Sequence, residues 1–193
     1  MTTKIILFNG PPRSGKDTAT DFAMKHLGKR GVHYRFAAPL KDATHALFGL
    51  KVSREHFDQC KNVPSELFLG MSPREAYIWM SEGAVKPKFG KDFFAKIAVH
   101  IISERIVSSG KSDGVVVVSD CGFAEEVDAI VDTFGAENVA VVHIKRPGTD
   151  FANDSRSYIT NVDCQKYLIH NNGGLGDFKD QVIATVKAIA DAK

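Results

Sequence analysis

The 193-residue sequence lacks any apolar run of the length that a membrane-spanning helix needs. Its first apolar stretch, residues 5–8, leads directly into a glycine-rich loop, so we interpret it as a core strand rather than a signal peptide. The sequence also has no internal repeat and no low-complexity segment. We therefore expect no membrane partner and a cytoplasmic location.

The sequence also contains few cysteines and only a small net charge. Cys60, Cys121 and Cys164 are odd in number and have neither metal-binding nor redox spacing, which suits a reducing compartment. The formal net charge is only +2, so any basic binding site must be local. With 44% apolar and 25% charged residues, the composition is that of a globular domain with a sizeable core.

What the sequence does contain is a phosphate-loop motif near its start. The apolar strand is followed by residues 10–16, GPPRSGK, which match G-x-x-x-x-G-K, and then by a helix over about 16–27. Glycines permit positive φ and close backbone approach, so successive N–H groups and the helix N-terminus can converge on phosphate oxygens. Lys16 would reach the β- and γ-phosphates. The predicted nucleotide-binding residues in this loop are Gly10, Pro11, Arg13, Ser14, Gly15, Lys16, Asp17 and Thr18.

Two carboxylates are candidates for metal binding and catalysis. Asp17 stands where this motif usually has Ser or Thr to hold Mg²⁺, and a carboxylate is also a good Mg²⁺ ligand. Asp120 ends the apolar run over 114–118, which we expect to be a buried parallel strand whose carboxyl end lies in the ligand crevice. Either carboxylate could hold Mg²⁺ or act as a base, and Asp120 could also be the N-cap of a helix that begins near Phe123.

Basic side chains at helix and strand ends are candidates for binding anions. Arg146 follows a strand over 139–144 and would leave the sheet on the side of the phosphate loop, where a guanidinium could stack on adenine or contact phosphates. Arg74 lies in the first turn of a helix whose N-cap is Ser72. The helix dipole disfavours a cation there, so Arg74 is either an anion-binding residue or an ordinary exposed arginine.

Residues 84–94 interleave lysines with phenylalanines around a proline and a glycine. Lysines that follow phosphates and aromatic faces that stack on bases suit a nucleic-acid or nucleotide acceptor. At least one of Phe93 and Phe94 should instead begin the core face of the next helix, which we expect to reach Ser108. The predicted acceptor-binding residues are Arg35, Arg74, Lys86, Lys88, Phe89, Lys91 and Arg156.

Strands that alternate with helices along the chain predict an α/β fold. We expect a P-loop NTPase fold of the nucleoside monophosphate kinase-like type, with a five-stranded parallel sheet and helices on both faces. A GTPase is disfavoured because no base-reading Asn-Lys-x-Asp segment is present. We predict a single domain over 1–193, with an acceptor-binding insertion over about 51–95 and a mobile lid over about 146–163.

Six segments, taken in order, resemble the phage deoxynucleoside monophosphate kinase family over nearly the whole chain: GPPRSGKDTATDF, FAAPLKDATHALFG, SPREAYIWM, VVVVSD, VVHIKRPG and LIHNNGGLGDFKDQV. The resemblance implies a P-loop kinase fold, ATP and Mg²⁺ as cofactors, and transfer of the γ-phosphoryl group. Three features depart from that family. Its arginine two residues after the strand-end Asp is here Gly122, its lid segment Asp-x-His-x-Ser/Thr-Glu is here DSRSY (154–158), and its Gly-Thr-Asp turn is replaced over 81–91.

The segments SEGAVKPKFGKDFF and SDCGF together resemble the phage 5-hydroxymethyluracil DNA kinases, which phosphorylate the base hydroxymethyl group in DNA. A primary alcohol needs a base as it attacks, for which Asp120 or Asp17 is available, and a base within a duplex must first be extruded. Our main prediction is therefore a kinase of 5-hydroxymethyl-deoxyuridine in phage DNA, acting in the host cytoplasm. The alternative is a kinase that converts free deoxynucleoside monophosphates to diphosphates with ATP, and the third is a non-catalytic nucleotide-binding switch.

Overall fold

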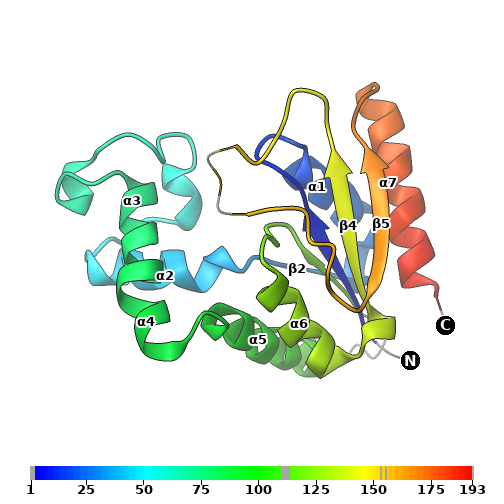
Figure 1. Cartoon of the computed structure of the whole chain (residues 1–193), viewed down its shortest axis with the longest axis horizontal. Coiled ribbons are helices and arrows are strands. Elements are labelled where there is room, and N and C mark those ends of the chain that lie inside the picture. The colour runs from blue at the N-terminus through cyan, green and yellow to red at the C-terminus, as the bar shows by residue number, and fades with distance from the viewer. Residues whose placement is uncertain (1–2, 110–113, 153, 155, 193) are drawn as a thin grey trace. The chain divides into compact units, whose positions relative to one another are not determined.

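The computed structural model describes residues 3–109, 114–152, 154 and 156–192. The chain divides into two compact units, one formed by residues 36–97 and the other by residues 1–35 together with 98–193 (Figure 1). The larger unit contains the sheet and the phosphate loop, and the smaller unit contains the predicted insertion over 51–95.

The larger unit contains a five-stranded sheet in which every neighbouring pair is parallel, as predicted. The strand order is β2-β3-β1-β4-β5, so the strand that leads into the phosphate loop is central. Within the sheet, Leu7 of β1 pairs with Val118 of β3 on one side and Val141 of β4 on the other. The strands are β1 (Lys4–Asn9), β2 (Gly31–Tyr34), β3 (Val115–Val118), β4 (Val139–Lys145) and β5 (Gln165–His170).

Helices cover this sheet on both faces. On one face, Ala23 of α1 (Lys16–Leu27) and Phe178 of α7 (Leu175–Ala190) join a core with Ile6 and Phe8 of β1. The alternating residues of β1, Ile5 and Leu7, point to the opposite face and are also fully buried. Strands that are buried on both faces read as continuous apolar runs, which explains the uninterrupted valines of β3. The unit also contains α6 (Ala124–Phe134) and the greater part of α5 (Phe93–Ser109).

The smaller unit is helical and has its own aromatic core. Phe57, Phe68 and Ala76 are buried together, and the Nε2 of the buried His45 shares a 2.7 Å hydrogen bond with the hydroxyl of Tyr77. Ser72 forms the predicted N-cap, in a full capping box with Glu75. The elements are α2 (Ala37–Leu47), short 3₁₀ helices over Arg54–Phe57 and Glu66–Phe68, α3 (Pro73–Ile78), a π-helix over Trp79–Val85, and α4 (Lys86–Phe89).

β2 ends at Tyr34 and α2 begins at Ala37, so Pro39 lies in the first turn of that helix. Proline is tolerated here because it lies in the first helical turn, where backbone N–H groups have no intrahelical partner. The N-cap of α6 is Phe123, so Asp120 does not have the capping role that the sequence also allowed. Within the described part of the chain, no helix combines the length and apolar character needed to cross a membrane.

Candidate active site

The two glycines of the phosphate loop are required by close backbone packing. A Cβ on Gly10 would lie 2.7 Å from both the carbonyl oxygen of Ile144 and the Oγ of Ser14. Gly15 has φ +106°, and a Cβ there would lie 2.7 Å from the Nδ2 of Asn171. That amide nitrogen donates a hydrogen bond of 2.9 Å to the Ser14 carbonyl, so the loop is braced by the residue that follows β5.

The loop ends in an uncapped helix N-terminus. Gly15 is the N-cap of α1 and supplies no side chain, so the first-turn N–H groups beginning at Lys16 have no side-chain cap in the described structure. The Ser14 hydroxyl is buried and has no hydrogen-bond partner among the described residues. Backbone N–H donors without a side-chain cap and the positive end of a helix dipole are the features that bind phosphate, so the loop fits the predicted anion.

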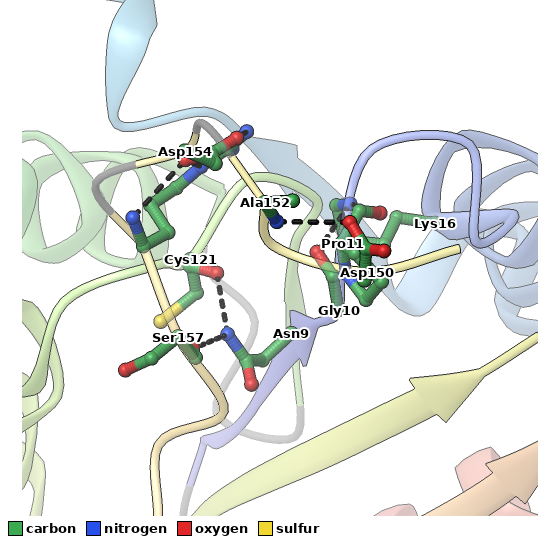
Figure 2. Close-up of polar contacts among 10 residues, drawn as sticks. Asn9, Gly10, Pro11, Lys16, Cys121, Asp150, Ala152, Asp154 and Ser157 are labelled. Carbon is green, nitrogen blue, oxygen red and sulfur yellow. Dashed lines mark hydrogen bonds and ion pairs between the residues drawn. The ribbon is translucent and has the colours of Figure 1, made fainter.

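Lys16 is already positioned at this loop. Its ammonium group donates hydrogen bonds to the carbonyl oxygens of Gly10 (2.7 Å) and Pro11 (2.8 Å) (Figure 2). Burial is the main reason that the pKa of Lys16 is lowered from 10.5 to about 8, and the nearby charge of Arg156 lowers it further. The ammonium group is thus partly desolvated, and its two hydrogen bonds hold it beside the loop.

The two predicted carboxylates flank Lys16 but differ in environment. Asp17 is 84% exposed and makes an ion pair of 3.4 Å with Arg35, which the sequence placed among the acceptor-binding residues. Asp120 is half-buried, and its charge raises the pKa values of both Lys16 and Arg156. Both acids therefore belong to the environment of the phosphate loop, where acids next to bound phosphates are suited to catalysis or to metal binding.

No group of three or more His, Cys, Asp or Glu side chains within the described ranges is arranged to hold a metal ion by itself. Mg²⁺ in nucleotide sites is usually held by one or two carboxylates together with phosphates and water. Asp17 and Asp120 supply that number of carboxylates, so the residues present fit Mg²⁺ that arrives with a nucleotide.

The side chain of Arg156 packs directly against Gly122. The Arg156 guanidinium forms two hydrogen bonds with the carboxylate of Asp154, of 2.8 and 2.6 Å. This carboxylate is the main reason that the pKa of Arg156 is raised. The Cγ of Arg156 lies only 2.5 Å from the position that a Cβ on Gly122 would take. The Arg156 side chain of the predicted lid therefore packs in the space that is left because residue 122 has no side chain.

Asn9, which the sequence analysis did not single out, connects three segments of the site. Its Nδ2 donates hydrogen bonds of 3.1 Å to the carbonyl oxygens of Cys121 and Ser157 (Figure 2). Its Oδ1 accepts a hydrogen bond of 3.2 Å from the Ile159 amide. Asn9 is fully buried at the carboxyl end of β1. An amide directly before the first loop glycine, at the end of an apolar strand, is the signal that could have identified it.

The second half of the predicted lid is fastened to the sheet. The Nε2 of His143 lies 2.9 Å from the Ile159 carbonyl, and the Tyr158 hydroxyl donates a hydrogen bond of 3.2 Å to the Ile144 carbonyl. Ile159 and Val162 are also buried. Residues 153 and 155 of the predicted lid lie outside the described residues. Mobility of the segment over 146–163 stays a prediction, and it would require breaking these contacts at its carboxyl-terminal end.

Arg146 lies beside the phosphate loop, as predicted, because its guanidinium donates a hydrogen bond of 3.2 Å to the Arg13 carbonyl. Arg146 also lines a cavity of about 330 Å³ at the carboxyl ends of β4 and β5. This pocket is open to solvent and lies where ligands bind in open parallel sheets, at the carboxyl ends of the strands. Its other lining residues are Lys145, Pro147, Thr149, Tyr158, His170 and Asn172.

The other predicted acceptor-binding residues lie in the smaller unit. Arg74, Lys88 and Lys91 are exposed, whereas Lys86 is ion-paired with Glu82 at 2.6 Å. Phe89 is 58% exposed and lies against Phe93, with ring centroids 5.0 Å apart. The structure therefore keeps Phe89 and two of the three lysines accessible to a ligand and engages the third lysine in an ion pair with a neighbouring acid.

Comparison with known proteins supports the fold. No protein-family model matches the chain, and no curated protein matches its sequence. Solved structures do match, among them the unliganded structure of a sugar kinase from a Janibacter species. The match has a TM-score of 0.52 at 11% sequence identity and covers 100% of this chain and 96% of that one. At this identity the likeness shows a shared fold, and the chain thus has the α/β architecture of a known kinase structure.

Proposed function

We propose that this chain is an ATP-dependent kinase that transfers the γ-phosphoryl group to the hydroxymethyl group of 5-hydroxymethyl-deoxyuridine in DNA. The observation that carries the proposal is the position of Lys16, which lies half-buried at an uncapped helix N-terminus and is hydrogen-bonded to two loop carbonyls. A preorganised cation beside N–H donors favours the charge that develops on a transferring phosphoryl group.

The chemistry assigns a role to each charged group of the site. ATP with Mg²⁺ would supply the γ-phosphoryl group. The loop amides and Lys16 would bind its phosphates, and Arg146 would contact the adenine or the phosphates from the edge of the 330 Å³ cavity. Asp17 and Asp120 would hold the metal, and one of them would accept the hydroxyl proton.

The proposed reaction exchanges one phosphorus–oxygen bond for another. The acceptor oxygen forms a bond to the γ-phosphorus, the bond from that phosphorus to the bridging oxygen breaks, and ADP leaves. The proton of the attacking hydroxyl passes to the carboxylate of Asp120 or Asp17. An alcohol needs such a base because it is neutral at pH 7, whereas a monophosphate acceptor is already ionised.

The residues of the smaller unit support a DNA acceptor. Lys88 and Lys91 are exposed, and Phe89 presents 58% of its surface to solvent next to them. Accessible cations with an accessible aromatic ring form the combination that binds nucleic-acid strands by charge and stacking.

One observation favours the second candidate, a kinase of free deoxynucleoside monophosphates. Arg156 fills the space over Gly122, so a guanidinium is present near the strand-end acid although residue 122 itself has no side chain. A guanidinium there is suited to bidentate binding of a phosphate dianion. The absence of arginine at position 122 is therefore weaker evidence against a monophosphate acceptor than the sequence alone indicates.

The test uses γ-labelled ATP and Mg²⁺ with two kinds of acceptor in parallel. One is an oligonucleotide with a single 5-hydroxymethyluracil, with thymine at the same position as its control, and the other is a panel of free deoxynucleoside monophosphates. We expect label only on the modified oligonucleotide. Label on a monophosphate would replace the proposal with the second candidate, and no transfer to either acceptor would refute both.

The variant Lys16→Ala should abolish transfer while the protein remains folded, with Lys25→Ala as the matched control. Lys25 is exposed in the last turn of the same helix, at the end opposite the phosphate loop. Equal activity of Lys16→Ala and the wild type would show that the loop does not bind the transferred phosphate. We expect a loss of about 10³-fold or more for Lys16→Ala, in line with the removal of a charged group that stabilises the transition state.

A further inference from the structure

The segment between α2 and α3 contains a compact loop over 61–74 whose ends are joined. The Arg74 amide donates a hydrogen bond of 2.9 Å to the Lys61 carbonyl, and inside this closure the Ser65 amide donates one of 3.0 Å to the Met71 carbonyl. Further backbone bonds of 3.0 Å join Phe68 and Gly70 to the Ser65 carbonyl. Loops of this length with joined ends are rigid units of their own and are frequently functional.

The loop buries one apolar side chain and exposes its two neighbours. Phe68 is fully buried, with its ring centroid 5.0 Å from that of Phe57. Leu67 is 49% exposed and Leu69 is 83% exposed, which is the largest exposure among the large hydrophobic residues of the described structure. Phe68 thus anchors the loop to the core of the smaller unit while the leucines on both sides of it face solvent.

Leu69 also has a strained backbone. Its φ and ψ are +55° and +40°, in the left-handed region that glycine and asparagine adopt far more readily than leucine. Leu69 is the C-cap of the 3₁₀ helix over Glu66–Phe68, a position where glycine or asparagine is preferred, and its exposed side chain gains no burial there. Exposed apolar surface on a strained and rigid loop is a feature that folding opposes, so a role in binding is indicated.

The charges around the loop favour a polyanion as the ligand. Lys61 and Arg74, whose backbones close the loop, are both exposed, and no ion pair engages either of them in the described part of the chain. By contrast, nearby acids are engaged, since Asp58 pairs with Lys41 at 2.8 Å and Glu75 is hydrogen-bonded to Ser72. Glu66 is the one carboxylate within the loop itself before Arg74.

We propose that Leu69, supported by Leu67, is a wedge that enters the base stack of duplex DNA, while Lys61 and Arg74 bind the adjacent phosphates. The inference rests on the proposed function, because a kinase that acts on a base within a duplex must hold the gap that opens when the base is extruded. Apolar side chains inserted between base steps, flanked by basic residues, are a known way to open a stack. A rigid loop that is fixed by Phe68 keeps the wedge in place.

The test compares wild type, Leu69→Asn and Leu175→Asn as a matched control. Leu175 is a 67% exposed leucine in the larger unit, at the start of α7. The substrates are a duplex and a single strand, each with 5-hydroxymethyluracil next to 2-aminopurine, whose fluorescence rises when it unstacks. Asparagine tolerates the left-handed conformation, so Leu69→Asn should melt at the same temperature as the wild type or higher.

We expect the wild type and Leu175→Asn to raise the 2-aminopurine fluorescence of the duplex. Leu69→Asn should not, and its transfer to the duplex should fall by about tenfold or more while transfer to the single strand stays within about twofold. Leu69→Met, which keeps an apolar wedge of similar volume, should retain about half of the duplex activity or more.

Other outcomes overturn the wedge. If Leu69→Asn phosphorylates the duplex as well as the wild type does, Leu69 is not a wedge, although the proposed function stands. An equal loss on single and double strands would mean general docking rather than base opening. A change in the sedimentation of the chain without any change in duplex transfer would make the loop a protein interface. If the wild type labels only free monophosphates, the proposed function itself fails, and the wedge with it.

Discussion

The aliphatic part of Arg156 lies against the Cα of Gly122, with its Cγ 2.5 Å from where a Cβ on residue 122 would stand. Any side chain at residue 122 would clash with the aliphatic part of Arg156, so the arginine would have to move away. The guanidinium itself is held by Asp154. A cation is thus supplied to this part of the site by the segment after β4 rather than by the turn after β3.

Gly122→Ala should therefore act through Arg156. The added Cβ forces the arginine away, and because Arg156 lowers the pKa of Lys16, that pKa should rise above about 8. Arg156→Ala should raise it in the same way, and the double variant should differ little from either single one, since the effects of residues in contact are not additive. The pKa is measured from the pH dependence of ATP binding.

Gly176→Ala is the matched control for this pair. Among the described residues, no heavy atom beyond its own chain neighbours and helix backbone lies within 4 Å of a Cβ built on Gly176, which is in helix α7. The substitution should therefore stabilise the fold by about 1 kcal/mol and leave the pKa of Lys16 unchanged. If Gly122→Ala leaves both the pKa and the thermal stability unchanged, the packing of Arg156 on Gly122 is refuted.

ATP binding should weaken above about pH 8. Burial lowers the pKa of Lys16 from 10.5 to about 8, so the free protein loses this charge as the pH rises through that value. Bound phosphates favour the charged form and raise the pKa, and the affinity should therefore fall by up to about tenfold per pH unit between the two pKa values. Isothermal titration calorimetry at a series of pH values on both sides of the pKa of Lys16 measures this slope.

Lys16→Arg is the control for that profile. Arginine remains charged over this range, so the affinity of Lys16→Arg for ATP should not depend on pH in the same way. That affinity should be lower than the wild type's at neutral pH, because the geometry of a guanidinium differs from that of an ammonium group. A wild-type affinity that is constant up to about pH 10 would show that the ammonium group is not desolvated as the structure indicates.

Asn9→Ala should destabilise the larger unit by about 2 kcal/mol, since it leaves the buried Cys121 carbonyl and Ile159 amide, and the part-buried Ser157 carbonyl, without their partner. Urea unfolding measures the loss. Hydrogen exchange gives a local readout, because the Ile159 amide should exchange much faster than the amides of β1. Asn161→Ala is the control, since Asn161 is exposed and its side chain accepts a bond from the neighbouring Thr160 hydroxyl.

The three lysines of 86–91 should contribute unequally to DNA binding. Charge reversal of Lys88 or Lys91 should reduce the dependence of log K on log salt by about 0.7 to 0.9 for each phosphate that the variant no longer binds. Reversal of Lys86 should change it less, because that ammonium group is engaged by Glu82 at 2.6 Å. Binding is measured by fluorescence anisotropy at several salt concentrations, and an equal effect of all three reversals would contradict the pairing.

Features that depend on local chemistry could be predicted from the sequence. The strand, loop and helix over 4–27, the capping box at Ser72 and the five parallel strands are all found. Each follows from a short-range rule: glycine at tight loops, a hydroxyl and an acid at helix starts, or an apolar run in a doubly covered sheet. The approach of Arg146 to the phosphate loop also followed, because parallel strands end at one edge.

Features that depend on distant contacts could not be predicted. The hydrogen bonds of Asn9 reach residues 121, 157 and 159, and no spacing rule connects these positions. The same holds for Asn171, which braces Ser14, and for the Arg156 side chain over Gly122. The π-helix over Trp79–Val85 was also missed, since its residues are as compatible with an α-helix.

The chain enters the smaller unit once, after Arg35, and leaves it once, within α5 after Ile97. Because the chain passes between the two units only twice, exchange of the single contiguous segment 36–97 would replace the smaller unit entirely. The sheet, the phosphate loop and the residues that brace it remain untouched by such an exchange. Recombination at two points could therefore exchange the predicted insertion over 51–95 as a whole without coordinated change throughout the chain.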